Sequence, residues 1–178
     1  MASQGPLSPA TVVNDTGIGT VGWLNPGNAT ASDDSRATAT LTAANAQSNY
    51  LKATDFGFTI PSGATIDGIV VEWERLRTGA RDCLDNAIRI VKTDVIGLTD
   101  KSAAGNWPTT EAYQSYGGIA DLWGETWTDT DINATIFGAA LSAKATALGN
   151  STANIDHVRI TVYYTVVTLN MDVWEVEH

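Results

Sequence analysis

The chain has 178 residues, 43% of them hydrophobic, and its formal net charge at pH 7 is −10. This length suffices for one domain whose core needs no disulfide or metal ion. The excess of acidic side chains argues against binding to nucleic acid or to an anionic membrane surface, because both need clustered Lys and Arg. The single cysteine, Cys83, excludes an internal disulfide and a zinc site built from several cysteines, and packing is its expected role.

Residues 1–20 are rich in Ser, Pro, Gly and Thr and contain one apolar pair, Val12 and Val13. This composition predicts an extended N-terminal arm that is ordered only where it docks on another surface. The segment has neither the basic nor the apolar region of a secretory signal peptide. No apolar run in the chain approaches the roughly 20 residues that span a bilayer.

Strand-length segments separated by turn residues predict a sandwich domain over residues 21–166. The expected strands are residues 36–41, 50–52, 56–60, 66–76 and 87–91. Residues 66–76 form the longest central candidate. There Ile69, Val71 and Trp73 should face the core while Glu72 and Glu74 face outward, because side chains alternate across a strand.

The middle of the chain, residues 97–125, is loop-like, and residues 102–116 are expected to cross one edge of the sandwich. Asp129 or Thr130 could then cap a short helix from Asp131 to about Phe137, because such side chains accept hydrogen bonds from free backbone N–H groups. Alternation over residues 139–143, followed by Gly149 and Asn150, predicts a hairpin into the last strand.

The last strand, residues 155–166, has the strictest alternation in the sequence. Its apolar set is Val158, Ile160, Val162, Tyr164 and Val166, and polar residues or Tyr163 stand between them. Such a run is typical of a long half-buried strand. With regularly spaced short strands and no long helix, the sequence predicts an all-β fold. We expect an antiparallel two-sheet, jelly-roll-like sandwich with one short helix and extended terminal arms.

Residues 167–178 combine apolar and acidic side chains and are predicted to be a C-terminal tail or an exchanged strand. An apolar strand after the last core strand can pair with the edge of another subunit. Packing back on its own sheet is the alternative. The predicted subunit or capsid interface consists of Val12, Val13, Met171, Val173, Trp174 and Val176.

Glu72 and Glu74 are the first candidates for catalysis, because their Cα atoms lie about 7 Å apart on one strand face. This overlaps the roughly 6.5–9.5 Å between the carboxyl groups of inverting glycosidases. Any two exposed Glu at this spacing meet the criterion, and the nearby Arg75 and Arg77 favour surface ion pairing. Nucleophile-elbow, P-loop and dinucleotide-binding motifs are also absent from the sequence. We therefore predict no enzymatic activity.

The sequence Asp129-x-Asp131-x-Asn133 is similar to the start of a calcium-binding loop. Ala134 and Ala140 occupy the positions where an EF-hand needs Gly and Glu, so an EF-hand is excluded. We expect no cofactor. A looser structural calcium site remains an alternative, with candidate ligands Asp33, Asp34, Asp129 and Asp131.

Five aromatic side chains lie in the loop-like region and could stack on sugars: Trp107, Tyr113, Tyr116, Trp123 and Trp127. Aromatic residues in long loops more often cover the edge of a sandwich or lie in an interface. We therefore favour a structural role for them and keep glycan contact as the alternative.

A set of turn and core motifs over about residues 20–165 resembles a known kind of domain. The motifs are Trp23-x-Asn25-Pro26-x-Asn28-Ala29, Ser32-Asp33-Asp34, Phe56-Gly57-Phe58-x-Ile60-Pro61-x-Gly63-Ala64-x-Ile66-x-Gly68-Ile69, Asp85-Asn86, Tyr116-Gly117-Gly118, Leu122-Trp123-Gly124, Trp127-Thr128-x-x-Asp131-Ile132-Asn133, Phe137-Gly138 and Asp156-His157-Val158-x-Ile160-x-Val162-Tyr163-Tyr164. Together they resemble a β-sandwich domain of tailed-bacteriophage virion proteins and of some bacterial surface proteins.

The resemblance implies an accessory virion protein of the decoration or head-fibre type. The predicted function is non-enzymatic decoration of the outside of a phage capsid. The expected partners are the major capsid protein lattice and further copies of the chain, as a homotrimer, without nucleic acid or membrane. The expected location is the surface of the virion head, after synthesis in the host cytoplasm.

Two other functions stay open at this stage. The first is a carbohydrate-binding or receptor-binding module of a tail, a fibre or a bacterial surface protein, acting through the five loop aromatics. The second is a glycoside hydrolase that uses Glu72 and Glu74.

Overall fold

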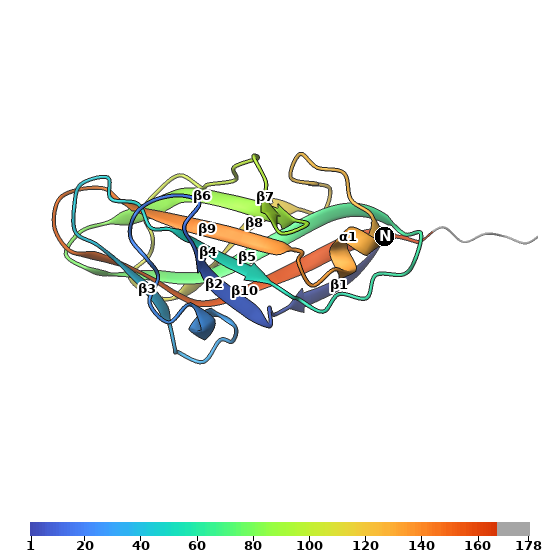
Figure 1. Cartoon of the computed structure of the whole chain (residues 1–178), viewed down its shortest axis with the longest axis horizontal. Helices are drawn as coiled ribbons and strands as arrows, with labels where there is room; N and C mark the ends of the chain where they lie inside the picture. The colour runs from blue at the N-terminus through green and yellow to red at the C-terminus, as the bar shows by residue number, and fades with distance from the viewer. Residues whose placement is uncertain (167–178) are drawn as a thin grey trace, which may run out of the picture.

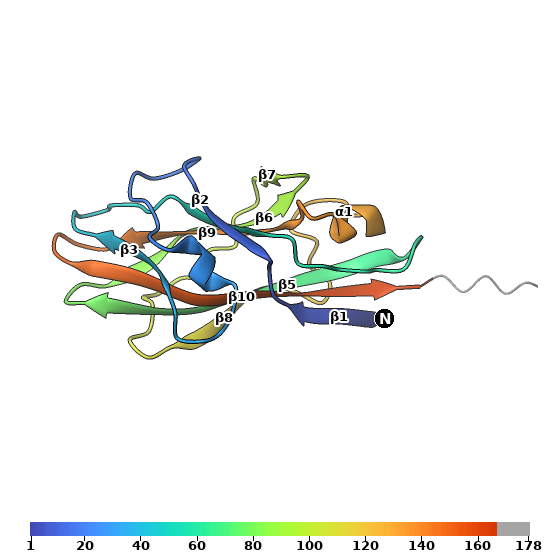
Figure 2. The same ribbon diagram turned by 60° about the horizontal axis from the view of Figure 1, so that its bottom comes forward.

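Two antiparallel β-sheets, packed face to face, form the sandwich seen in the computed structural model, which describes residues 1–166 (Figures 1 and 2). The first sheet contains β1 (Ala2–Leu7), β3 (Ala37–Leu41), β5 (Thr65–Gly79), β8 (Ala112–Gly118) and β10 (Ser151–Thr165). The second sheet contains β2 (Thr11–Asp15), β4 (Tyr50–Thr54), β6 (Cys83–Lys92), β7 (Val95–Ile96) and β9 (Gly138–Ala145). A 3-10 turn η1 (Pro26–Ala29) and a short helix α1 (Asp129–Asn133) complete the described elements, and neither could cross a membrane. The prediction of an all-β sandwich is confirmed.

The strand order is that of a jelly roll. From β3 to β10 the strands are arranged as β3-β10-β5-β8 in the first sheet and β4-β9-β6-β7 in the second, so the chain repeatedly crosses between the sheets. The predicted hairpin into the last strand is therefore wrong. β9 and β10 belong to different sheets, and the turn between them passes from one sheet to the other.

The central pair β5 and β10 supplies much of the core. Val158, Ile160 and Val162 of β10 are fully buried. On β5 the fully buried side chains are Ile69, Val71 and Trp73, as the alternation predicted. The inward face of β10 ends near Val162, since Val166 is 48% exposed.

Bulges in two strands change which side chains face inward. In β10 the register with β5 shifts between Ile155 and His157, so Asp156 is an extra residue. Ile155 and Val158 are consequently both buried in the core, while Asp156 and His157 stay together on the outer side. A second bulge in β6, between Asp85 and Ala87, turns Asp85 inward.

Residues 1–20 are not an arm outside the sandwich. β1 pairs with β10 in the first sheet and β2 pairs with β4 in the second, so each strand satisfies backbone groups that an edge would leave unpaired. Ala2 lies opposite Tyr164, which places the N-terminus beside the end of β10 (Figure 2). The prediction of a separate N-terminal arm is corrected.

Three other elements differ from the expectation. Residues 56–60 form no strand: the side chain of Asn133 bonds to both the N–H and the C=O of Ile60, at 2.7 and 2.9 Å, in place of a neighbouring strand. The loop-like region contains β8, which forms an edge of the first sheet beside β5. The short helix begins earlier than expected, and its capping residue is Thr128 rather than Asp129 or Thr130.

A buried carboxyl group joins the two sheets at β5 and β6. The Asp85 side chain on β6 pairs with Arg75 on β5, and both side chains are almost completely buried. Trp107 Nε1 and Tyr116 OH each donate to Asp85 at 2.8 Å, and the N–H of Ala103 donates at 2.9 Å. The expected surface pairing of Arg75 is therefore wrong, because Arg75 lies inside the sandwich.

We predict that Asp85→Ala lowers the free energy of unfolding by about 3–5 kcal/mol, because it leaves the Arg75 charge buried without a partner. Urea unfolding followed by tryptophan fluorescence measures this change. Asp82→Ala is the matched control, since it breaks a more exposed pair with Arg77 and should cost about 1 kcal/mol or less. The double variant Arg75→Met, Asp85→Leu should recover part of the loss. Equal costs for the two Asp variants would contradict the assignment.

Candidate functional site

The outer face of the first sheet carries a connected group of polar side chains. Arg159 on β10 donates to both carboxylate oxygens of Glu72 on β5, at 2.8 and 3.1 Å, and its guanidinium carbon lies 3.8 Å from the ring centre of Tyr113 on β8. The Tyr113 hydroxyl is 2.8 Å from Nδ1 of His157, whose Nε2 is 2.9 Å from the Ser8 hydroxyl. Burial lowers the pKa of His157. These contacts hold β10, β5, β8 and the β1–β2 connection together.

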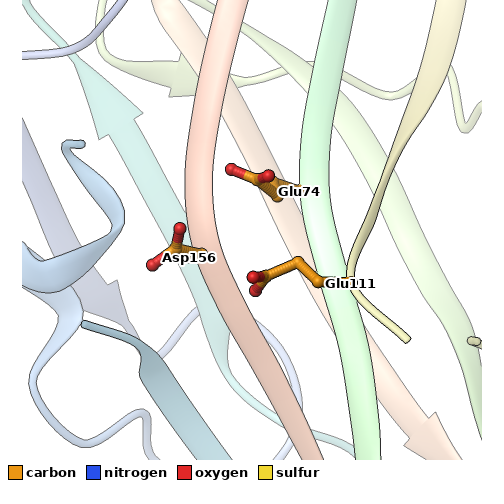
Figure 3. Close-up of side chains that lie close together, drawn as sticks. All are labelled: Glu74, Glu111 and Asp156. Atoms are coloured by element: carbon orange, nitrogen blue, oxygen red, sulfur yellow. The ribbon is translucent and has the colours of Figure 1, made fainter. Parts of the chain in front are cut away.

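Next to this group, three carboxyl groups converge. Glu74 of β5, Glu111 just before β8 and Asp156 at the β10 bulge each bring one oxygen to within 4.8 Å of the other two (Figure 3). Glu74 and Glu111 are partly buried, and Asp156 is 1% exposed. We call these three residues the carboxylate cluster.

The segment between η1 and β3 covers the carboxylate cluster. Arg36 donates to both oxygens of Glu111 at 2.8 and 2.9 Å, and this bonding lowers the pKa of Glu111. The backbone N–H of Asp34 interacts with Asp156. Burial nevertheless raises the pKa of Asp156, and the nearby charges of Glu111 and Glu74 act in the same direction. Carboxylate oxygens gathered in this way are ligands for a hard cation.

None of the four aspartates predicted as calcium ligands belongs to the carboxylate cluster. Asp33 accepts a bond from the N–H of Ser35, and Asp34 pairs with Arg36 at 2.8 Å. Asp131 forms the capping box of α1 with Thr128, and Asp129 accepts from the N–H of Gly63. Among the described residues, the structure does not gather these four carboxyl groups into one site.

Sequence reasoning missed the carboxylate cluster because its members come from three distant segments. Asp156 did leave one signal, since two polar residues in succession, Asp156 and His157, interrupt the alternation of the last strand. Such an interruption is typical of a bulge. Glu111 follows two threonines in a loop and belongs to no motif.

The structure does not bring the five loop aromatics together as a stacking platform. Trp107, Tyr116 and Trp123 are 2%, 4% and 0% exposed and belong to the core. Tyr113 and Trp127 are only partly buried, but their neighbours differ: Tyr113 contacts His157, and Trp127 packs edge-on against Phe137. Burial of these three residues agrees with the favoured structural role and contradicts the alternative of glycan contact for them.

The structure also places the predicted interface residues in different environments. Val12 is 6% exposed and packs in the core, whereas Val13 is 40% exposed on the outer side of β2. Met171, Val173, Trp174 and Val176 lie outside the described residues.

The two glutamates considered for glycoside hydrolysis have different surroundings. Glu72 is held by Arg159 and also contacts the Ser115 hydroxyl, while Glu74 belongs to the carboxylate cluster. A separate shallow hollow beside β7 is lined by Lys92, Thr93, Val95, Gly97 and Glu125.

No family model and no curated protein sequence matches the chain. Two solved structures are similar to it, and both are rich in β-strands. A CBM4 carbohydrate-binding module matches with a TM-score of 0.44 and 10% identity, over 84% of this chain and 92% of that one. The enzymatically active domain of tailspike protein 4 from bacteriophage CBA120 matches with a TM-score of 0.33 and 13% identity, over 88% of this chain and 19% of that one. Likeness at this level carries no inference about function.

Cys83 is fully buried in the core. Burial raises the pKa of its thiol from the ordinary value of 9.0 to about 12, against smaller opposing effects of Ser151, Arg75 and Arg77. The thiol is therefore held in its protonated form, which is not the nucleophile. This environment agrees with the packing role expected from the sequence.

We predict that ionisation of the Cys83 thiol lowers the free energy of unfolding, and that this effect appears only in alkaline solution. Because its pKa is raised on folding, its contribution is fully present below pH 9.0 and is lost as the pH rises toward about 12. Urea unfolding of the wild type and of Cys83→Ala, measured across this range, tests the effect. The wild type should lose more stability than the variant, whose cavity cost does not depend on pH. Parallel curves would refute the prediction.

Proposed function

We propose that the chain is a non-enzymatic structural protein of a phage virion, bound to the outside of the capsid as a decoration protein. The observation that carries the proposal is the place of β1 beside the last residues of β10, after which the segment 167–178 follows. Ala2 of β1 lies opposite Tyr164 of β10, so residue 1 and residue 166 lie at the same end of the sandwich (Figure 1). A module whose last described strand ends at one pole is suited to attachment there through the residues that follow, with the opposite pole projecting.

The attachment is assigned to the residues that follow Val166. Met171, Val173, Trp174 and Val176 give this segment an apolar sequence. Pairing with a sheet edge, either of another copy or of a capsid subunit, would satisfy its backbone and bury these side chains. On this proposal the chain forms a homotrimer on the major capsid protein lattice.

Avidity is the physical basis of such decoration. Three linked copies bind with a higher effective concentration than one, so contacts that are weak singly hold together when geometry allows them to form at once. The net charge of −10 supports the proposal in a second way, because it keeps a densely arrayed protein from aggregating.

Glycan or receptor binding remains the second candidate, with Tyr113 as the residue in question. Its ring is partly exposed and stacks with the guanidinium of Arg159 at 3.8 Å, on a face rich in hydrogen-bonding groups. A sugar stacking there would compete with Arg159. A titration of the full chain with a glycan panel, compared with Tyr113→Ala, tests this alternative.

We predict hundreds of copies of the chain per particle of the phage that encodes it, measured by quantitative mass spectrometry against the major capsid protein. The full chain should sediment as a trimer. Trp174→Ala with Val176→Ala should weaken both trimerisation and binding to undecorated particles by at least about tenfold, because avidity is lost. The matched control is Leu148→Ala, which removes an exposed apolar side chain in the turn between β9 and β10.

The two measurements separate the alternatives. A handful of copies per particle would assign the chain to the tail or to a fibre. Complete absence from particles, or a tail variant that trimerises and binds like the control, would contradict decoration through this segment.

A further inference from the structure

We propose that Glu74, Glu111 and Asp156 bind a calcium ion that joins β5, β10 and the segment before β8. The site is independent of the proposed function and does not use the aspartates that the sequence indicated. Figure 3 shows the three carboxyl groups gathered where these elements lie side by side.

The separation of the oxygens fits calcium. One oxygen from each residue lies within 4.8 Å of the other two. Calcium binds oxygen at about 2.3–2.6 Å, so two ligands on opposite sides of one ion lie up to about 5 Å apart. Magnesium demands near-octahedral geometry and usually keeps several of its waters, so three carboxylates from separate segments suit calcium better. The carboxylate cluster can therefore hold calcium with little movement.

Two buried oxygens in the carboxylate cluster have no donor. Among the described residues, Oδ1 of Asp156 and Oε2 of Glu74 are buried and accept no hydrogen bond. Asp156 is only 1% exposed, so solvent has little access to its carboxyl group. A buried polar atom without a partner is costly, and a bound cation would remove that cost.

The net negative charge of the carboxylate cluster also favours a divalent cation. Three carboxylates carry three negative charges, and Arg36, bonded to Glu111, supplies one positive charge. Two negative charges remain, and Asp34, which is also bonded to Nη2 of Arg36, adds a further exposed one. Arg159 is bonded to Glu72, and its charge acts on Glu74 only through space.

The segment between η1 and β3 lies beside the carboxylate cluster and contacts it. Residue Thr30 forms a backbone bridge to His157, and Arg36 reaches Glu111, so residues 30–36 close over the carboxyl groups. Calcium takes six to eight oxygen ligands, so water would complete the coordination beyond the three side chains. The ion would then hold this loop and the β10 bulge against β5.

Isothermal titration calorimetry and thermal unfolding of the full chain test the site, with calcium chloride or with a chelator. The wild type should bind one calcium ion with a Kd of about 1 mM or tighter, and its Tm should rise with calcium. Glu74→Gln and Asp156→Asn should each weaken binding by about tenfold or more, since each removes one charged ligand. Asp67→Asn removes the same charge from the same strand, away from the carboxylate cluster, and should bind like the wild type.

Stability without metal distinguishes lost binding from lost folding. Glu74→Gln removes a like charge from the carboxylate cluster, so in chelator its Tm should equal or exceed that of the wild type. Absence of a calcium response in the wild type up to about 10 mM, well above the range expected for extracellular modules, would overturn the proposal. So would an equal response in Glu74→Gln and Asp67→Asn, or a magnesium affinity that matches the calcium affinity.

Discussion

The buried pair of Asp85 and Arg75 determines much of how the sandwich is organised. A carboxyl group between two sheets must be paired and hydrogen-bonded, because an unpaired charge there is strongly destabilising. Asp85 meets this requirement with Arg75, Trp107, Tyr116 and the backbone of Ala103. Two of the aromatics suited to sugar stacking are therefore committed to the interior. The Asp85 carboxylate also fixes the loop between β7 and β8, through its bonds to Ala103 and Trp107.

A second buried aspartate, Asp156, has fewer hydrogen-bond donors around it. Both aspartates lie at β-bulges, which place a polar residue where regular alternation would not. Asp85 points inward and meets four donors, whereas Asp156 lies beside two other carboxyl groups, and one of its oxygens has no donor within residues 1–166. Since both residues lie at bulges, the bulge alone does not explain the difference, which supports the proposed calcium ion at Asp156.

Sequence reasoning found the elements whose signal is local. Alternation identified β5 and β10 with their inward residues, and the jelly-roll class followed from strand spacing. It missed β1, where Gly5 and Pro6 weaken the strand pattern and pairing with β10 decides the structure. It also missed the partners of Asp85 and Asp156, because these come together only through the order of the strands. A structural role was favoured for the loop aromatics, but which of them are buried could not be predicted, since a loop aromatic looks the same in sequence whether it faces the core or solvent.

The position of β10 relates the fold to the proposed attachment at one pole. β10 pairs with β5 along its length, with β1 near its end and with β3 near its start. If the segment after Val166 is the anchor, a pull on it runs along β10. The hydrogen bonds of an antiparallel pair are perpendicular to the strands, so such a pull loads many of them together in shear instead of opening them one at a time. A strand bonded on both sides at the centre of its sheet is thus well placed to carry force from an anchor into the body. β1 pairs with the part of β10 nearest Val166, so its hydrogen bonds to β10 would share the load.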